Sequence, residues 1–239
     1  MKIYLSQALG TFVTFAGKHE ESPGVMTFTF KPSAGANWEA GQYYVYMMPG
    51  ALLDKRTAFR PFTVASSPTE GFLQITTRIP SKPSLVKQNL LNLKVGQKVY
   101  TFGPYGFFTL PKTAKEIVMV AGGIGVTPFR SMLAEIGSGA CPKITLLYAS
   151  RDDKPLYTAE LDAFSAKHPE FTWHSITEPR HLDAAAIAEY IKTPTGATFL
   201  LSGPKPMVKG IAKTLHDELK VPSKQIKHDV FKGYPWPLA

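Results

Sequence analysis

A chain of 239 residues with 44% hydrophobic and 19% charged residues is long enough to bury a core in one large or two modest domains. Its net charge of +9 is concentrated in residues 1–111, which hold 11 Lys/Arg against 5 Asp/Glu, but there is no compact basic run, so we expect no nucleic acid partner. The single cysteine, Cys141, excludes an intrachain disulfide and a cysteine-ligated iron–sulfur cluster, and the histidines lack zinc-site spacing, so redox chemistry here needs an organic cofactor and no metal.

The first half of the chain has the pattern of β structure. Short alternating runs at 25–30, 42–47, 72–77 and 98–102 are separated by Pro, Gly and Ser, which is typical of an antiparallel barrel or sandwich. The alternation in residues 3–16 favours a strand over a secretory leader. The apolar stretch 43–53 is interrupted by Pro49 and Gly50 and falls short of the roughly 20 residues of a spanning helix, so we expect a cytoplasmic protein without a membrane span.

After Pro111 the pattern changes to apolar strands that alternate with helical segments. The predicted strands are 117–121, 144–148, 171–176, 198–202 and 226–230, and the predicted helices are 128–136, 158–167, 183–191 and 206–219. This order predicts an α/β domain with a doubly wound parallel sheet. We therefore place a β-barrel domain at residues 1–111 and the α/β domain at residues 112–239.

A glycine-rich turn follows the first predicted α/β strand. Gly122, Gly123 and Gly125 let backbone amides approach a diphosphate, because they carry no Cβ atom. Thr127 is expected to cap the following helix and Pro128 to occupy its first turn, where free amides favour an anion. The turn predicts a dinucleotide or phosphate site, although a tight strand-to-helix turn without a ligand would also account for it.

A second candidate site lies in the first half, at Arg60-Pro61-Phe62-Thr63. Arg60 is suited to hold a phosphate, Phe62 offers a flat ring face, and Thr63 provides a hydroxyl. An ordinary arginine at a barrel rim beside a buried phenylalanine would have the same sequence.

Four motifs together resemble the ferredoxin–NADP reductase superfamily in their order and spacing. They are residues 60–63, residues 103–108, residues 122–128, and residues 202–204 with Met207. The resemblance extends from Gly41 to Phe231 and implies that the barrel binds flavin, as FAD, and that the α/β domain binds NADPH or NADH.

The resemblance also implies roles for individual residues. Arg60 would bind the flavin phosphate, Pro61 belongs to the same motif, Phe62 would stack on the isoalloxazine, and Thr63 would bond near the flavin N5. Ser84, Leu85, Val86 and Lys87 resemble the second phosphate-binding turn, although its usual glycine is missing. Gly122, Gly123, Gly125, Thr127 and Pro128 would cradle the nucleotide diphosphate, and Gly203, Pro204 and Met207 would bring the nicotinamide against the flavin.

Two positions depart from the pattern of the superfamily. Ser202 stands where many members have a cysteine beside the nicotinamide, and Asp229 stands where many have a glutamate. With Thr63, these are the expected catalytic residues, although Ser202 would also suit a hydroxyl that caps a turn. Phe231 is expected to cover the other face of the flavin, with Tyr234 and Trp236 as alternatives.

Nucleotide preference is expected to depend on the loops after the second and third α/β strands. Ser150 and Arg151 favour the 2′-phosphate of NADPH, whereas the neighbouring Asp152 and Asp153 oppose it. The sequence therefore leaves NADPH and NADH open, with a slight preference for NADPH.

These observations predict a flavin-dependent NAD(P)H oxidoreductase that passes electrons from the nucleotide through FAD to a separate acceptor. Residues 71–115 contain no acidic side chain and would attract an acidic ferredoxin or flavodoxin in trans. One alternative is an NAD(P)H:flavin reductase that uses flavin as a substrate. Another alternative is a flavin-binding electron-transfer subunit of a larger complex.

Overall fold

The computed structural model describes residues 10–48, 59–150, 155–177 and 180–231. These residues form two compact units. The first unit contains the described residues up to Thr109 together with Arg130–Glu135, and the second contains Leu110–Phe129 and the described residues from Ile136 onward.

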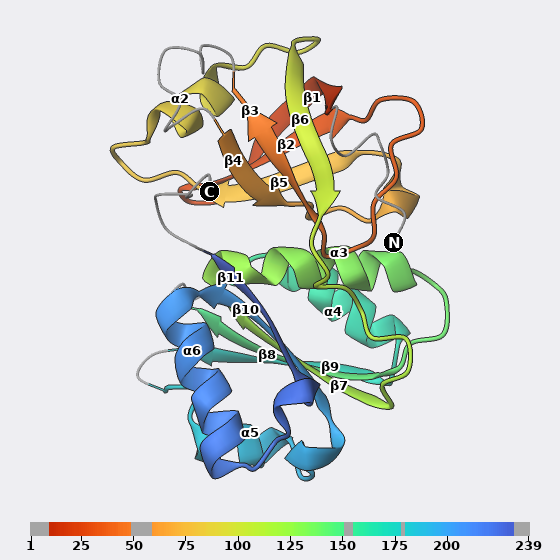
Figure 1. Ribbon diagram of the computed structural model, residues 1–239, viewed down its shortest axis with the longest axis vertical. Helices are drawn as coiled ribbons and strands as arrows, with labels where there is room; N and C mark the ends of the chain where they lie inside the picture. Colours follow the sequence, from red (N-terminus) through yellow and green to blue (C-terminus); the bar gives the residue numbers. More distant parts are fainter. Residues whose placement is uncertain (1–9, 49–58, 151–154, 178–179, 232–239) are drawn as a thin grey trace. The chain divides into compact units, whose positions relative to one another are not determined.

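The first unit is a curved antiparallel sheet (Figure 1). Its strands are β1 (Thr11–Ser22), β2 (Val25–Lys31), β3 (Tyr43–Met47), β4 (Phe59–Thr63), β5 (Leu73–Arg78) and β6 (Lys98–Tyr105). They form one six-stranded sheet in the order β4-β3-β6-β1-β2-β5. The alternating runs of the sequence therefore correspond to strands of a half-barrel, as predicted.

The core of this unit lies on the concave side of the sheet. Every second residue of β3 is buried, as are Val13 and Phe15 of β1, and Phe15, Phe30 and Tyr46 belong to a single hydrophobic cluster. The ring centroids of Phe15 and Phe30 are 5.5 Å apart, and those of Phe30 and Tyr46 are 5.4 Å apart. Because each buried large side chain contributes about 1.5–3 kcal/mol, this alternation fixes the register of the sheet.

A short helix, α2 (Leu85–Asn92), follows β5 and packs on the same core through Val86 and Leu90. The sequence predicted a phosphate-binding turn at 84–87 but no helix. The reason is that only two of its eight residues, four positions apart, are buried, and this pattern is too short to reveal a helical period.

The second unit contains a parallel sheet. Its strands are β7 (Glu116–Gly122), β8 (Lys143–Ser150), β9 (Phe171–Thr177), β10 (Thr198–Pro204) and β11 (Ile226–Phe231). The spatial order is β11-β10-β7-β8-β9 and every pairing is parallel. The strand order reverses beside β7, which is where open α/β sheets bind ligands at the carboxyl ends of their strands.

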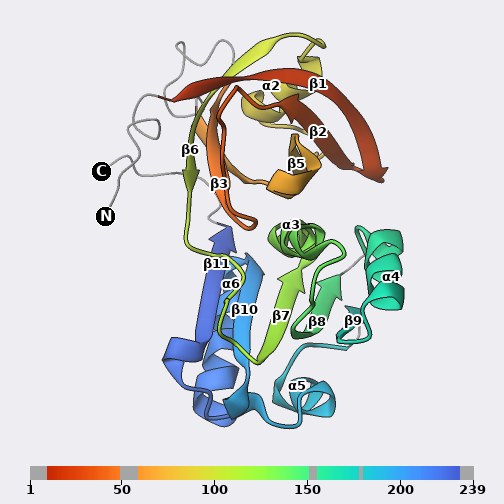
Figure 2. The ribbon, with the colours of Figure 1, turned by 90° about the vertical axis from the view of Figure 1, so that its right-hand side faces the viewer.

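Helices cover both faces of this sheet. They are α3 (Thr127–Ile136), α4 (Thr158–Lys167), α5 (Ala184–Tyr190) and α6 (Lys205–Lys213), and α6 continues into a π-helical turn, Thr214–Glu218. Figures 1 and 2 show α4 on one face and α5 and α6 on the other. The predicted doubly wound fold is thus confirmed.

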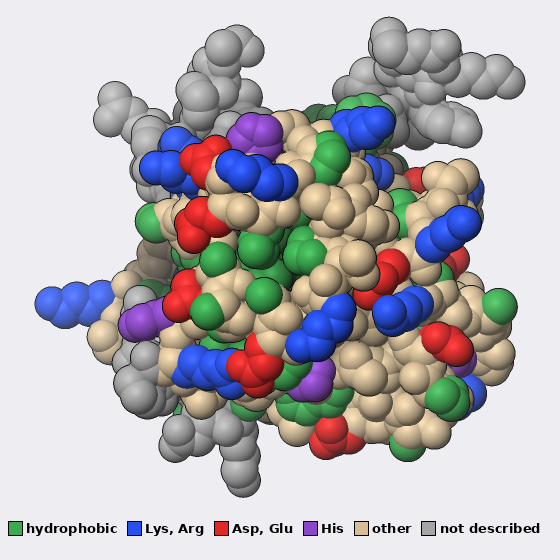
Figure 3. Space-filling view, turned by 90° about the horizontal axis from the view of Figure 1, so that it is seen from below, with side chains coloured by type: hydrophobic (Ala, Val, Ile, Leu, Met, Phe, Trp, Pro, Cys, Tyr) green, Lys and Arg blue, Asp and Glu red, His purple; other side chains and the backbone are tan. Residues whose placement is uncertain are grey.

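Positive and negative charges are more nearly balanced in the second half of the chain than in the first. Basic and acidic side chains are interspersed over the face that carries α5 and α6 (Figure 3), in agreement with the 16 Lys/Arg and 13 Asp/Glu of residues 112–239. Among the helices that the structure describes, none has the length and apolar character to cross a membrane.

Candidate functional site

The carboxyl ends of β7 and β10 carry the glycine-rich turn and the turn at residues 202–204. The two strands pair with Ala121 opposite Ser202, so the turns that follow them are neighbours. A Cβ atom at Gly125 would overlap the Ser202 carbonyl oxygen, and one at Gly122 would overlap the Met207 sulfur. Glycine is therefore required at position 125, where the overlap is with backbone, whereas a side chain at position 122 would first have to displace the flexible Met207 side chain.

Gly123 has a different environment. Its φ of +52° is in the left-handed region, and a Cβ atom there would meet nothing within 4 Å. Tyr148 donates a hydrogen bond of 3.0 Å to the Gly123 carbonyl and so holds the turn in place. The open space beside this glycine leaves room for a nucleotide diphosphate.

Thr127 does not cap α3, contrary to the prediction. Residues Gly123–Val126 already form a 3-10 turn, Thr127 has helical angles of −56° and −46°, and its hydroxyl donates to the Ile124 carbonyl at 3.0 Å. The helical turns therefore start at Gly123, and their free amides lie at the glycines. Pro128 lies in the first turn of α3, as predicted.

Ser202 is fully buried near the end of β10, and its hydroxyl has no hydrogen-bond partner among the described residues. A buried hydroxyl without a hydrogen bond lowers the stability of the folded chain by about 1–3 kcal/mol, and a bound ligand that contacts the hydroxyl would remove this cost. The hydroxyl does not cap a turn. Gly203 follows with a φ of +154° and packs against the backbone of Gly122, and Pro204 leads into α6, which carries Met207.

Asp229 on β11 lies opposite Ser202 on β10. Burial raises the pKa of its carboxyl to about 6, and His228 opposes this shift. An ionisable group that titrates near neutral pH therefore lies beside the unpartnered hydroxyl.

Phe231 ends β11 opposite Pro204. Its side chain, Tyr234 and Trp236 lie outside the described residues.

The loop after β9 contains a basic residue that the sequence did not single out. Arg180 forms an ion pair with Glu189 and donates to the Tyr190 hydroxyl at 3.1 Å, with its guanidinium 5.6 Å from the centre of that ring. Arg180 lies in a loop, and its two partners lie nine and ten residues later in α5, so the sequence has no periodic pattern that would predict these contacts. Ser150 ends β8 and is buried, and Arg151 lies outside the described residues.

In the first unit, Arg60, Pro61, Phe62 and Thr63 lie on the edge strand β4. Arg60 donates to the Phe59 carbonyl at 2.6 Å, and Phe62 packs on the core with its ring 5.8 Å from that of Tyr46. Thr63 lies opposite Tyr43 on β3, and Pro61 is exposed. The structure thus places the arginine and the phenylalanine two residues apart on one strand, and their flavin contacts stay predictions.

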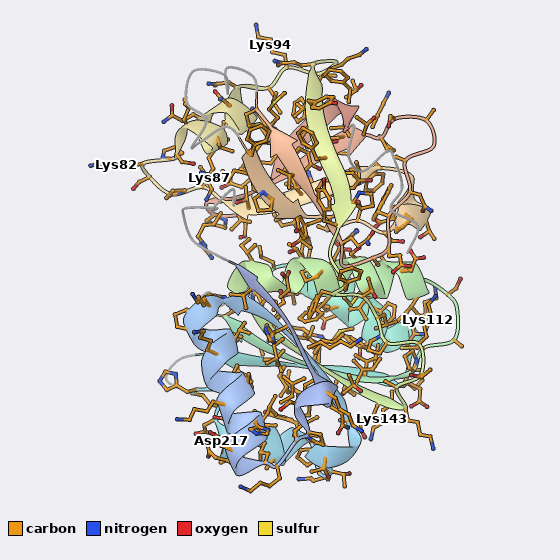
Figure 4. The ribbon with its side chains drawn as sticks, viewed as in Figure 1. Lys82, Lys87, Lys94, Lys112, Lys143 and Asp217 are labelled. Atoms are coloured by element: carbon orange, nitrogen blue, oxygen red, sulfur yellow. The ribbon has the colours of Figure 1, made fainter. Side chains whose placement is uncertain are left out.

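The first turn of α2 contains the second predicted phosphate site. Ser84 precedes the helix without a side-chain cap, and Val86 is buried, so only its amide could contact a ligand. Lys87 donates to the Arg78 carbonyl at 2.6 Å. Burial, and then the neighbouring Arg78 charge, lower the pKa of Lys87. Free helix amides near these cations would favour an anion, and the phosphate site stays a prediction. Figure 4 shows Lys82 on the same side of this unit. Leu85 is half exposed here.

Comparison with known proteins agrees with these features. A model of the oxidoreductase NAD-binding domain matches residues 119–213. A subunit of the Na(+)-translocating NADH-quinone reductase of Pseudomonas aeruginosa is 29% identical over 233 residues, covering 86% of this chain and 56% of that protein. The Neisseria meningitidis counterpart of that protein is 30% identical over 202 residues, covering 73% and 49%. The chain thus spans about half the length of these relatives.

Solved structures share the fold. A ferredoxin-NADP+ reductase from Plasmodium falciparum has a TM-score of 0.78 at 18% identity, covering 93% of this chain and 96% of that chain. A cytochrome P450 reductase from Amycolatopsis has a TM-score of 0.79 at 21% identity, covering 93% and 70%.

The relatives correct two expectations. They are named as a subunit of an enzyme that translocates Na(+), so a free ferredoxin or flavodoxin as partner and a cytoplasmic location are wrong. A basic region attracts any anionic surface, so the charge of the sequence does not distinguish a soluble carrier protein from a subunit of a complex or from a membrane. The motif order, the fold and the domain match agree on one point: residues 119–213 match an oxidoreductase NAD-binding domain, and the chain has the fold of the ferredoxin-NADP+ reductase and the cytochrome P450 reductase.

Proposed function

We propose that this chain is the NADH-oxidising, FAD-binding component of a multi-subunit reductase at a membrane, and that it passes electrons to another component of that assembly. The observation that carries the proposal is the packing of the glycine turn against residues 202–204 and Met207, beside an open space at Gly123. The names of the relatives support the assignment to a complex.

Residues 1–111 are proposed to hold the flavin and residues 112–239 the nucleotide. The described residues fit an FAD diphosphate, because Lys87 and Arg78 lie beside the first turn of α2, and helix amides and cations together suit phosphate oxygens. Arg60 would hold a phosphate from β4, Phe62 would contact the ring, and Thr63 would bond near its N5. A bound flavin accepts two electrons from a nicotinamide and releases them singly.

Ser202 and Asp229 are proposed to line the nicotinamide position. The hydroxyl of Ser202 is buried without a partner among the described residues, so a bound carboxamide or ring edge would satisfy it. Asp229 lies on the next strand and, with its raised pKa, could hold a proton near neutral pH. In this arrangement both residues position the ring and neither is required to break a bond.

NADH is proposed as the physiological nucleotide. The relatives are named as NADH-quinone reductase subunits. In addition, Arg180 already pairs with Glu189 and Tyr190, so a 2′-phosphate would have to compete with the Glu189 carboxylate for it.

The proposal is tested by the visible spectrum of the purified chain, reconstituted with FAD and kept free of oxygen. We expect about one bound flavin per chain, bleached by one equivalent of NADH and at least about tenfold more slowly by NADPH. A colourless protein that reduces only added free flavin would reject the proposal in favour of a flavin reductase. Equal rates with the two nucleotides would reject the NADH assignment alone.

A further inference from the structure

The convex side of the first unit carries an apolar surface made of residues that are not assigned to the flavin or nucleotide site. Along β1, β3 and β6 the residues that alternate with the buried ones point to this side. Phe12 lies opposite Tyr100, Tyr100 lies opposite Met47, and Met47 lies opposite Phe59. Val45 and Phe102 form the adjacent row. We call these six residues, Phe12, Val45, Met47, Phe59, Tyr100 and Phe102, the outer aromatic face.

The four rings of this face form a continuous chain. The ring centroids are 4.8 Å apart for Phe12 and Tyr100, 5.1 Å for Tyr100 and Phe102, and 6.0 Å for Phe59 and Phe102. Phe12 is 53% exposed, and the other members are partly exposed. The rings therefore support one another across neighbouring strands.

Such a face is unusual for an antiparallel sheet that packs its core on one side. The other side of such a sheet normally faces water and carries polar residues in alternation with the buried ones. A contiguous exposed apolar patch on a folded protein indicates a surface that binds something.

Basic residues border the outer aromatic face. Lys98 precedes Tyr100 by two residues on β6, and it lies opposite Thr14, which lies opposite Lys31 on β2. Both lysines are exposed, and neither forms an ion pair within the described ranges. Strands β2, β3, β4 and β6 contain no acidic residue, and those of β1, Glu20 and Glu21, lie at its far end.

We infer that the outer aromatic face rests on the headgroup region of an anionic membrane. This inference rests on the proposed function in one respect, namely the membrane at which the chain is proposed to act. Aromatic rings enter the interface between headgroups and acyl chains, while lysine amines remain among the anionic headgroups.

The charge pattern distinguishes this occupant from another protein. The core of a protein interface is enriched in aromatic residues but depleted of lysine. Here two exposed lysines adjoin the rings, and β2, β3, β4 and β6 carry no acidic side chain that would repel a negatively charged surface. Anionic lipid therefore complements both the apolar and the basic parts of the face.

The test uses the full chain loaded with FAD and sedimented with vesicles. We expect binding to vesicles of phosphatidylglycerol and phosphatidylcholine in equal parts, and little binding to phosphatidylcholine alone or at high salt. Phe12→Ser should lower the partition coefficient about tenfold. Lys98→Glu should lower it about fivefold or more. Val95→Ser, at a residue that is 75% exposed and is not a member of the face, is the matched control and should bind as the wild type does.

Several outcomes would overturn the inference. They are wild-type protein that stays in solution with anionic vesicles, and a Phe12→Ser variant that binds as well as the wild type. A dimer in light scattering that Phe12→Ser converts to a monomer would assign the face to a second copy instead. Bleaching by NADH is measured on the same samples. Wild-type protein that is bleached by NADH but does not bind vesicles rejects the face alone, and wild-type protein that binds vesicles but is not bleached rejects the proposed function alone.

Discussion

At the scale of single residues, the sequence identifies positions better than it identifies their surroundings. The motif order located Ser202 and Asp229 near the ends of two strands. It could not show that the Ser202 hydroxyl is buried without a partner among the described residues, or that partial burial raises the pKa of the Asp229 carboxyl. Both properties depend on the pairing of β10 with β11, which brings together residues 27 positions apart in the chain.

The raised pKa of Asp229 predicts a pH-dependent stability. Its pKa is about 6 in the native state, against about 3.9 in an unfolded chain. The native state therefore binds more protons between these values, and the stability that Asp229 contributes is lost as the pH rises from about 4 to 6. We expect Asp229→Asn to be about 3 kcal/mol more stable than the wild type at pH 7.5 and only about 1 kcal/mol more stable at pH 4.5. Urea unfolding at both pH values measures this difference, and a difference that does not change with pH would contradict the burial of the carboxylate.

At the scale of elements, strands were predicted more accurately than helix ends. Alternation over five or more residues is a strong signal because one face of each strand packs on the core. The start of α3 was misjudged, because a threonine before a proline has the pattern of a cap whether or not the preceding glycines are already wound into a turn. Helix α2 was missed because its buried face consists of two residues.

The glycine turn predicts unequal effects of a substitution by alanine at two of its positions. An added methyl group at Gly125 would overlap the Ser202 backbone, so Gly125→Ala should destabilise the chain by about 3 kcal/mol. Gly123→Ala meets open space and should cost only about 1 kcal/mol, from its positive φ, while weakening NADH binding. Urea unfolding and NADH titration of both variants separate the two effects. An equal loss of stability in both variants would show that the turn does not pack on β10 as described.

At the scale of the whole molecule, the pattern of the sequence was sufficient for the fold and for the class of chemistry. The change from period-two runs to alternating strands and helices near Pro111 reflects two different ways of burying a sheet, on one face or on both. Partner and location were not predictable in this way. They depend on surfaces such as the outer aromatic face, whose members are brought together by the register of four strands and are scattered in the sequence.

The assignment of flavin and nucleotide to different parts of the chain predicts that the two sites can be impaired separately. Arg60→Ala removes a cation proposed to bind the flavin phosphate, and a charge-assisted hydrogen bond contributes about 1.5–3 kcal/mol, so FAD should bind about 10- to 100-fold more weakly. Arg60→Lys keeps the charge and should lose less affinity for FAD.

Gly123→Val should leave FAD in place but prevent its bleaching by NADH, because a branched side chain would occupy the space beside the turn. Flavin fluorescence after ultrafiltration measures retention, and anaerobic bleaching measures nucleotide use. Unchanged flavin retention in Arg60→Ala would remove Arg60 from the site, and loss of flavin from Gly123→Val would show that the two sites are not separate.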